Sequence, residues 1–282
     1  MKPLRIFLLA LTLSVGMGSG LRADTPKRVV TVGGAVTEIV YALGAEDLIA
    51  GSDTTSYFPP AAEKLPKVGY MRALSAEGIL SLRPDLLIVT DDAGPPAVLK
   101  QIESVGTNIL YLKSGRSVAD IEDSIRKLAE VLGREPQAKA LMAKMDQDAA
   151  TLADEVSELK APPRVMFILQ HGGGAPMVAG GGTAADSIIR LSGGKNVVTA
   201  YDGYKPLTPE AAVAMRPDAI LITDQGLTQA GGKDALLKVP GVAATPAAKA
   251  GRVYAMDALL LLGFGPRMVE AARALNKMYR AQ

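Results

Sequence analysis

One stretch of the sequence decides the fold: LSAEGILSLRPDLLIVTD, residues Leu74 to Asp91. It aligns without a gap with LTPEAAVAMRPDAILITD, residues Leu207 to Asp224. In this alignment Glu77 matches Glu210, and the two Arg-Pro-Asp triplets coincide. We therefore expect a duplicated chain, with one copy of the unit in each half.

The repeated unit predicts a helix followed by a buried strand. Ser75 is a favourable N-cap for a helix over residues 76–82, and Pro84 prevents that helix from continuing. Leu86 to Thr90 is a continuous apolar run, which is typical of a strand covered on both faces of a parallel sheet. Further strand-like and helix-like segments alternate on both sides of each copy. This alternation predicts an α/β fold with two Rossmann-like lobes.

A long helical tract separates the two copies. Ala119 to Leu132 predicts one helix that ends at Gly133, and Pro136 falls in the first turn of a second helix. About 24 residues at 1.5 Å each give the second helix a length of roughly 36 Å, comparable to the width of a small domain. An ordinary surface helix would have the same pattern, but its place between the repeats favours a spacer. We expect a single long interdomain helix that joins two lobes: residues 24–134, 135–161 and 162–282.

Residues 1–23 have the pattern of a secretory signal peptide. Lys2 and Arg5 precede the apolar run Ile6 to Val15, which is shorter than the roughly 20 residues that a membrane span requires. Cleavage is expected after Ala23, and an uncleaved membrane anchor is the alternative. We predict that the mature protein is soluble and exported.

Composition excludes several classes of function. The 282 residues include 31 basic and 29 acidic side chains, and this net charge of +2 gives no field that would favour nucleic acid. The chain contains no cysteine, which excludes disulfides, thiolate metal sites and cysteine nucleophiles. Its single histidine, His171, excludes a multi-histidine metal site. We therefore expect neither a nucleic-acid partner nor a metal centre built from cysteine or several histidines.

Enzyme signatures are weak in this chain. Gly193 to Asn196 lacks the earlier glycine and the hydroxyl of a phosphate-binding loop. Gly180 to Ala185 fits the loose dinucleotide fingerprint, with Asp202 about 20 residues further on. No Gly-x-Ser-x-Gly elbow occurs after the predicted signal peptide. We predict that the protein is not an enzyme, and an exported nucleotide-cofactor enzyme is the distant alternative.

Tyr70 lies just before the first copy of the repeat, in a Gly69-Tyr70-Met71-Arg72 segment that the second copy lacks. A phenol that ligates ferric iron must become phenolate, and a nearby guanidinium favours that charged form. Tyrosine is a known axial ligand of haem iron. A plain surface pair of tyrosine and arginine would have the same sequence, so the residues alone leave both interpretations open.

Two other loops carry candidate residues. His171 directly follows a predicted strand and precedes three glycines, which let other groups approach closely. It could cap a loop, or it could converge with Tyr70 if the two lobes face each other across a cleft. Tyr57-Phe58-Pro59-Pro60 predicts a proline-stiffened loop that exposes two aromatic side chains.

Glu77 and Glu210 occupy the same position in the two copies, at the start of a predicted helix. An acidic residue in the first turn is favoured by the helix dipole, typically by about 0.3–1 kcal/mol, and this alone would explain either one. Two carboxylates at equivalent points of two lobes also predict a docking surface whose spacing is set by the long helix.

The Val68-Gly69-Tyr70-Met71-Arg72 motif, together with the repeat beside it, resembles the periplasmic haem-binding proteins of bacterial haem-uptake ABC transporters. The wider substrate-binding class also includes cobalamin and siderophore carriers, and a carrier of this fold for either ligand is the alternative. The resemblance implies two α/β lobes joined by one long helix, with haem in the cleft. It implies Tyr70 as axial ligand of the haem iron, Arg72 as its support, and His171 as ligand of a second, stacked haem.

The resemblance also implies partners. In the wider class, paired glutamates at the positions of Glu77 and Glu210 dock on arginines of the inner-membrane permease, which works with an ATPase. Some family members place a further arginine over the tyrosine oxygen, and residues 225–230 contain none. We expect a monomer, with loop side chains covering the transported haem: Met71, Met177 and Phe264, with Tyr57 and Tyr204 nearby.

Overall fold

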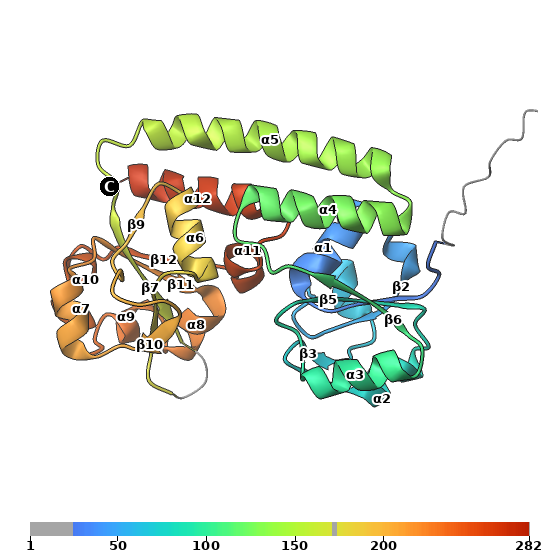
Figure 1. Cartoon of the computed structure of the whole chain (residues 1–282). Coiled ribbons are helices and arrows are strands. Elements are labelled where there is room, and N and C mark those ends of the chain that lie inside the picture. The colour runs from blue at the N-terminus through green and yellow to red at the C-terminus, as the bar shows by residue number, and fades with distance from the viewer. Residues whose placement is uncertain (1–24, 171–173, 282) are drawn as a thin grey trace, which may run out of the picture.

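The computed structural model describes residues 25–170 and 174–281. The predicted signal peptide and His171 therefore lie outside the described residues. Figure 1 shows two α/β lobes side by side, with helix α5 running across both. Within the described ranges, no helix combines the length and the apolar character that crossing a bilayer requires. The α/β prediction with two lobes and one long connecting helix is confirmed.

In the first lobe, four of the described strands form a parallel sheet in the order β2-β1-β5-β6. Their residues alternate between the two faces, as the period of a strand requires. Val29 and Ile88 pack towards α1 and α4, whereas Val30 and Leu87 pack towards α2 and α3. The sheet is therefore covered on both faces. The elements are β1 (Val29–Thr31), α1 (Gly34–Ala42), β2 (Ile49–Ser52), α2 (Ala76–Ser81), β5 (Leu86–Thr90), α3 (Pro96–Ser104), β6 (Asn108–Leu112) and α4 (Val118–Leu132), with a small hairpin of β3 (Gly69–Tyr70) and β4 (Ala73–Leu74).

The sheet of the second lobe is mixed, which corrects the expectation of a parallel one. Its described strands run in the order β10-β8-β7-β11-β12, with β9 also beside β7. Strands β8 and β10 are antiparallel to their neighbours. The segment between β7 and β8 is too short for a crossover helix, so the chain returns antiparallel. The elements are β7 (Arg164–Leu169), β8 (Met177–Ala179), α6 (Ala184–Leu191), β9 (Lys195–Asn196), β10 (Tyr204–Pro206), α7 (Pro209–Met215), β11 (Ala219–Thr223), α8 (Asp224–Gln229), α9 (Lys233–Leu236), α10 (Pro246–Lys249), β12 (Val253–Met256), α11 (Ala258–Leu262) and α12 (Met268–Arg280).

The two copies of the repeat have the same local structure. Ser75 Oγ accepts a hydrogen bond from the backbone N–H of the third residue of α2 at 3.1 Å, and Thr208 Oγ1 does the same for α7 at 3.2 Å. An arginine in the left-handed region follows each helix: Arg83, two residues after α2, has a φ of 45°, and Arg216, directly after α7, has a φ of 44°. The apolar strands β5 and β11 come next and are almost entirely buried. The predicted helix–strand unit is confirmed in both halves.

Helix α5 (Glu135–Ser157) packs against α4 in the first lobe and against α12 in the second. It comes after Gly133, whose φ of 65° ends α4 in the left-handed conformation that glycine adopts without strain. Its buried residues Ala138, Met145 and Leu152 recur every seven positions on the side that faces the two lobes. The connecting role of the helix is therefore clear (Figure 1), while the lobe boundaries at residues 134 and 161 stay a prediction.

Direct contacts also join the two lobes beneath α5. Arg267, which precedes α12, donates two hydrogen bonds to the buried carboxylate of Glu38 in α1, at 2.9 and 2.8 Å. The same guanidinium stacks on the Phe58 ring, 3.4 Å from its centroid. Tyr57 Oη donates to Asp257 at 3.0 Å and accepts from the backbone N–H of Leu259 at 2.8 Å. The expectation that this loop exposes two aromatics is wrong, because both are half-buried against the second lobe.

Candidate ligand-binding site

A cavity of about 920 Å³ lies between the two lobes. The first lobe contributes the start of α1, the β3–β4 hairpin and the loops after β5 and β6. The second lobe contributes the start of α6, Tyr204 of β10 and helix α11. Much of the wall is apolar, with these side chains among its members: Val36, Ile39, Leu112, Ile121, Leu259 and Leu262. The volume is near the upper end of the roughly 300–1,000 Å³ that ligand pockets usually have, so the cavity suits a large, mainly apolar ligand.

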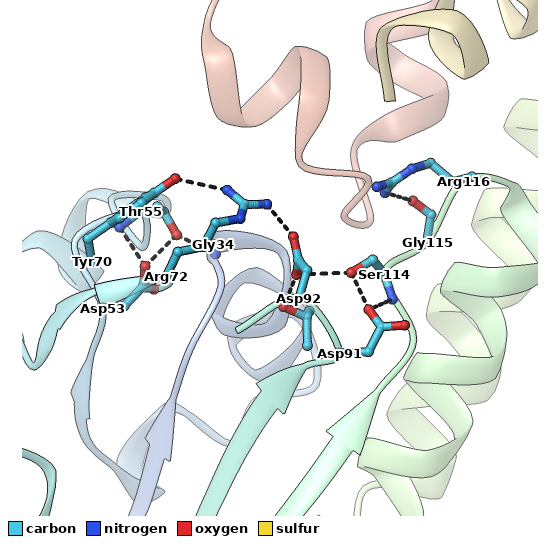
Figure 2. Close-up of polar contacts among 11 residues, drawn as sticks. Gly34, Asp53, Thr55, Tyr70, Arg72, Asp91, Asp92, Ser114, Gly115 and Arg116 are labelled. Atoms are coloured by element: carbon cyan, nitrogen blue, oxygen red, sulfur yellow. Dashed lines mark hydrogen bonds and ion pairs between the residues drawn. The ribbon is translucent and has the colours of Figure 1, made fainter. Parts of the chain in front are cut away.

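The β3–β4 hairpin presents Tyr70 to this cavity. Gly69 has a φ of 104°, and a Cβ on it would lie 2.8 Å from the carbonyl oxygen of Ala73, so the tight hairpin requires glycine there. Tyr70 is 45% exposed, which is unusual for a large side chain with apolar character. Arg72 Nη1 donates a hydrogen bond to Tyr70 Oη at 2.9 Å (Figure 2). The predicted pairing of this phenol and guanidinium is therefore present.

A network of side chains at the ends of β5 and β6 holds Arg72 in place (Figure 2). Arg72 Nη2 forms an ion pair with Asp92. The other carboxylate oxygen of Asp92 accepts from Thr90 Oγ1 at 2.7 Å and lies 3.0 Å from Ser114 Oγ. Burial alone would raise the pKa of Asp92, but the hydrogen bond from Thr90, the charge of Arg72 and the hydrogen bond from Ser114 together lower it. Asp92 thus stays ionised and directs the guanidinium at the phenol.

This arrangement has a definite chemical capability. A guanidinium within hydrogen-bond distance of a phenol oxygen can support a phenolate, and a phenolate oxygen is a strong ligand for ferric iron. A single phenolate would supply only one ligand. An iron ion bound there would therefore need its other ligands from a chelating molecule that carries it. A flat iron macrocycle meets that requirement and matches the apolar walls.

The other predicted pocket residues are placed unequally. Four of them line the cavity: Tyr57, Met71, Tyr204 and Phe264. Met177 does not line it, and lies in β8, where it pairs with Leu169 of β7. Phe264 is almost fully buried and contributes to the cavity wall from the second lobe. The hydroxyl of Tyr57 is hydrogen-bonded to Asp257 and Leu259 of the second lobe. Burial raises the pKa of this phenol. Burial also raises the pKa of Tyr204, although the charges of two nearby arginines act in the opposite direction.

Glu77 and Glu210 are both exposed, each in the first turn of its helix. The two helices, α2 and α7, belong to different lobes (Figure 1). The symmetric placement that the sequence predicted is present, and the docking role of the two carboxylates stays a prediction.

The glycine-rich segment of the second lobe has a structural explanation. A Cβ on Gly180 would lie 2.2 Å from the carbonyl oxygen of Tyr201, and one on Gly181 would lie 2.4 Å from Asp202 Oδ1. These glycines therefore allow the Tyr201–Asp202 segment to approach closely. That segment occupies the space that the pyrophosphate of a dinucleotide would need. In the first lobe, Asp53 accepts a hydrogen bond from the backbone N–H of Gly33, the N-cap of α1. Thr55 accepts one from the backbone N–H of Gly34, the first residue of this helix (Figure 2). Neither helix start favours a nucleotide cofactor.

The polar residues of the cavity wall that sequence reasoning missed include Asp92, Lys113, Ser114 and Arg116. A signal for them was present. Each lies just past the carboxyl end of a strand, either β5 or β6, and ligands of open parallel sheets bind at that edge. The apolar residues of α11 carry no comparable signal, because their run Ala258–Leu262 is indistinguishable from an ordinary core helix.

Two lobes joined by one long helix, with a large interlobe cavity lined by an exposed phenol, define a substrate-binding protein. A match to the periplasmic binding protein family covers residues 29–260, and the chain belongs to that family. The chain is similar to the solved periplasmic haem-binding protein BhuT in complex with two haems. That likeness has 43% identity and a TM-score of 0.87, and it covers 90% of this chain and 98% of that one.

Two further likenesses bear on the ligand. The periplasmic haem-binding protein RhuT from Roseiflexus sp. RS-1, solved in its apo form, is 38% identical, with a TM-score of 0.87 and coverage of 90% of this chain and 98% of that one. The vitamin B12-binding protein of Vibrio vulnificus strain CMCP6 is 27% identical over 266 residues, which are 92% of this chain and 89% of that one. The likeness to haem-binding proteins is therefore the stronger one.

Proposed function

We propose that this protein binds ferric haem in its interlobe cavity and delivers it to an inner-membrane ABC transporter. Tyr70 is the axial ligand of the haem iron, and Arg72 stabilises the phenolate. Met71, Phe264, Tyr57 and Tyr204 form part of the wall around the macrocycle.

One observation carries the proposal: the 2.9 Å hydrogen bond from Arg72 to the exposed Tyr70 hydroxyl on the wall of a large apolar cavity. An arginine–tyrosine pair on an open surface would have no such cavity beside it. The greater likeness to solved haem-binding proteins than to a vitamin B12-binding protein supports the same ligand.

The test is a set of absorbance titrations of the purified mature protein with ferric haem, cyanocobalamin and a ferric hydroxamate siderophore. We expect saturable binding of haem, with the charge-transfer bands of a ferric phenolate complex, and no saturable binding of the other two. Binding of cyanocobalamin or siderophore in preference to haem would refute the proposal and establish the alternative carrier function.

A second, stacked haem ligated by His171 is part of the proposal. BhuT is solved with two haems, and the large cavity of this chain is compatible with more than one macrocycle. His171 itself lies outside the described residues. Titration of His171→Ala should give one haem per chain where the unaltered protein gives two. A stoichiometry of one in the unaltered protein would rule out the second site.

We further propose where the protein acts and with which partners. The signal-peptide pattern of residues 1–23 and the family of the chain support export to the periplasm. The protein acts there as a monomer, divided into residues 24–134, 135–161 and 162–282, and performs no reaction on its cargo. Glu77 and Glu210 dock on the permease, whose ATPase drives transport. Glu77→Gln and Glu210→Gln should leave haem affinity unchanged and slow haem uptake into vesicles that carry the transporter.

A further inference from the structure

Three cationic side chains line the described part of the cavity: Arg72, Lys113 and Arg116. Arg72 is paired with Asp92 and Tyr70. Lys113 Nζ lies 3.3 Å from Asp120 Oδ1, so it also has a carboxylate partner. The third cation is held differently.

Arg116 lies in the loop between β6 and α4, at the mouth of the cavity. Its guanidinium donates one hydrogen bond, at 2.7 Å, to the carbonyl oxygen of its own neighbour Gly115 (Figure 2). Its backbone N–H donates to Asp120 Oδ2 at 3.1 Å, which fixes the loop without neutralising the side chain. Among the described residues, no carboxylate lies within ion-pair distance of this guanidinium. An exposed arginine thus retains donors for an anionic group of a ligand.

Arg116 lines the cavity as well as facing solvent. Its charge and that of Arg72 both act to lower the pKa of Tyr204, which faces them from the second lobe. The opposite part of the wall is apolar and includes Leu259 and Leu262 of α11. The cavity is therefore amphipathic, with an apolar body and one cationic edge on the first lobe.

We propose that Arg116 binds a carboxylate on the edge of the transported tetrapyrrole and thereby selects a carboxylate-bearing ring. This inference rests on the proposed function and names the ligand chemistry of one edge of the site. Haem carries two propionates on neighbouring positions of one edge and is otherwise apolar, which matches the wall. The corrin ring of cobalamin carries neutral amides there, and these gain much less from an unpaired guanidinium.

The experiment compares ferric haem with its dimethyl ester, in which both carboxylates are blocked, by absorbance titration from the same solvent stock. The proteins are the unaltered chain, Arg116→Gln and the control Arg126→Gln. Arg126 is an exposed residue of α4 that pairs with Glu122 and Asp123 on the same helix and does not line the cavity. Because Arg116 is also exposed, its replacement should not disturb folding.

We expect Arg116→Gln to weaken binding of ferric haem about tenfold and to change binding of the ester less than about twofold. The unaltered protein should prefer haem to the ester by a similar factor, and this preference should shrink at high salt because the contact is exposed. Arg126→Gln should change neither affinity.

Two results would overturn the assignment of Arg116 while leaving the proposed function intact. In one, Arg116→Gln binds haem as tightly as the unaltered protein. In the other, it loses the same factor for both ligands, which indicates a structural role. If the unaltered protein binds neither haem nor the ester, the proposed function fails and this inference fails with it.

Discussion

The two copies of the repeat differ at the carboxyl ends of their matching strands. Both have a hydroxyl N-cap, an arginine in the left-handed region and a buried apolar strand. After β5, Asp92 lines the cavity and forms an ion pair with Arg72. After β11, Thr223 instead caps a new helix by accepting from the N–H of Gly226 at 2.9 Å. The shared framework sets the architecture, and the residues just beyond the strand ends set the chemistry.

The segments before the repeated helices differ as well. In the first lobe, Tyr70 lies on a separate two-stranded hairpin outside the main sheet and is 45% exposed. In the second lobe, Tyr204 begins β10, which is hydrogen-bonded into the main sheet. A hairpin leaves the phenol free to meet a ligand, whereas a sheet strand makes it part of the wall. The comparison therefore predicts that only the first lobe supplies iron ligation from a tyrosine.

Replacement of each tyrosine in turn tests this asymmetry with the largest expected effect. Tyr70→Phe should weaken ferric haem binding about a hundredfold or more and abolish the charge-transfer bands, because the phenolate is lost. Tyr204→Phe should change affinity less than about threefold and leave the bands in place. Absorbance titrations at neutral pH measure both. Equal losses in the two variants would show that the lobes do not differ in the predicted way.

The fixed spacing of the lobes depends on the buried pair beneath α5. Arg267→Leu leaves the carboxylate of Glu38 buried without its partner, so we expect a loss of about 2–3 kcal/mol in unfolding free energy. Urea unfolding monitored by far-ultraviolet circular dichroism provides the measurement. The matched control, Lys144→Ala, breaks an exposed pair with Asp148 and should cost about 0.5 kcal/mol or less. A similar loss in both variants would contradict the inferred importance of the buried contact.

The carboxylates beyond the two strands provide a smaller and more specific test. Asp92→Asn should weaken haem binding about tenfold, because Arg72 is no longer directed at the phenol. Asp224→Asn, at the end of the second copy, should leave haem binding unchanged. If Asp224→Asn lost haem affinity and Asp92→Asn did not, the second lobe rather than the first would supply the carboxylate that supports haem binding.

The pH dependence of haem binding sharpens this test. The pKa of Asp92 is lowered in the folded protein. The contribution of ionised Asp92 to haem binding is therefore complete at every pH above the ordinary pKa of an aspartate carboxyl group. The contribution is lost only as pH falls through the lowered value. Titration of Asp92 should therefore cause no change in affinity between about pH 5 and pH 8. In Asp92→Asn, the acid decline below that window should be smaller than in the unaltered protein.

The smallest expected effects concern what the two copies share. Ser75→Ala and Thr208→Ala each remove one N-cap hydrogen bond and should each lower the unfolding free energy by about 1 kcal/mol. Urea midpoints of the two single variants measure this. A large effect in one variant with none in the other would show that the caps are not equivalent.

Local sequence patterns predicted the repeated unit, the long helix and the Tyr70–Arg72 pair, because each depends on neighbouring residues. Other features depend on contacts between segments far apart in the chain. Asp92 and Ser114 meet because β5 and β6 are adjacent in the sheet. Tyr57 and Phe58 are half-buried because Asp257 and Arg267 approach them from the second lobe.

Loop placement was a weaker guide to the cavity wall than strand order. Met177 and Tyr204 each begin a strand after a loop of the second lobe, yet only Tyr204 reaches the cavity. Strands β8 and β10 are antiparallel, so their first residues lie at opposite ends of the pair: Tyr204 pairs with Ala179, whereas Met177 pairs with Pro206. The sequence does not encode this antiparallel register locally.

The central claim is that the first-lobe hairpin, and not the second lobe, holds the iron through Tyr70. Its most direct test is a crystal structure of the mature protein with ferric haem, with diffraction data collected at the iron absorption edge. We predict an anomalous iron peak at direct bonding distance from Tyr70 Oη, with Arg72 still hydrogen-bonded to the same oxygen. An iron peak in the cavity without contact to Tyr70 would contradict the account.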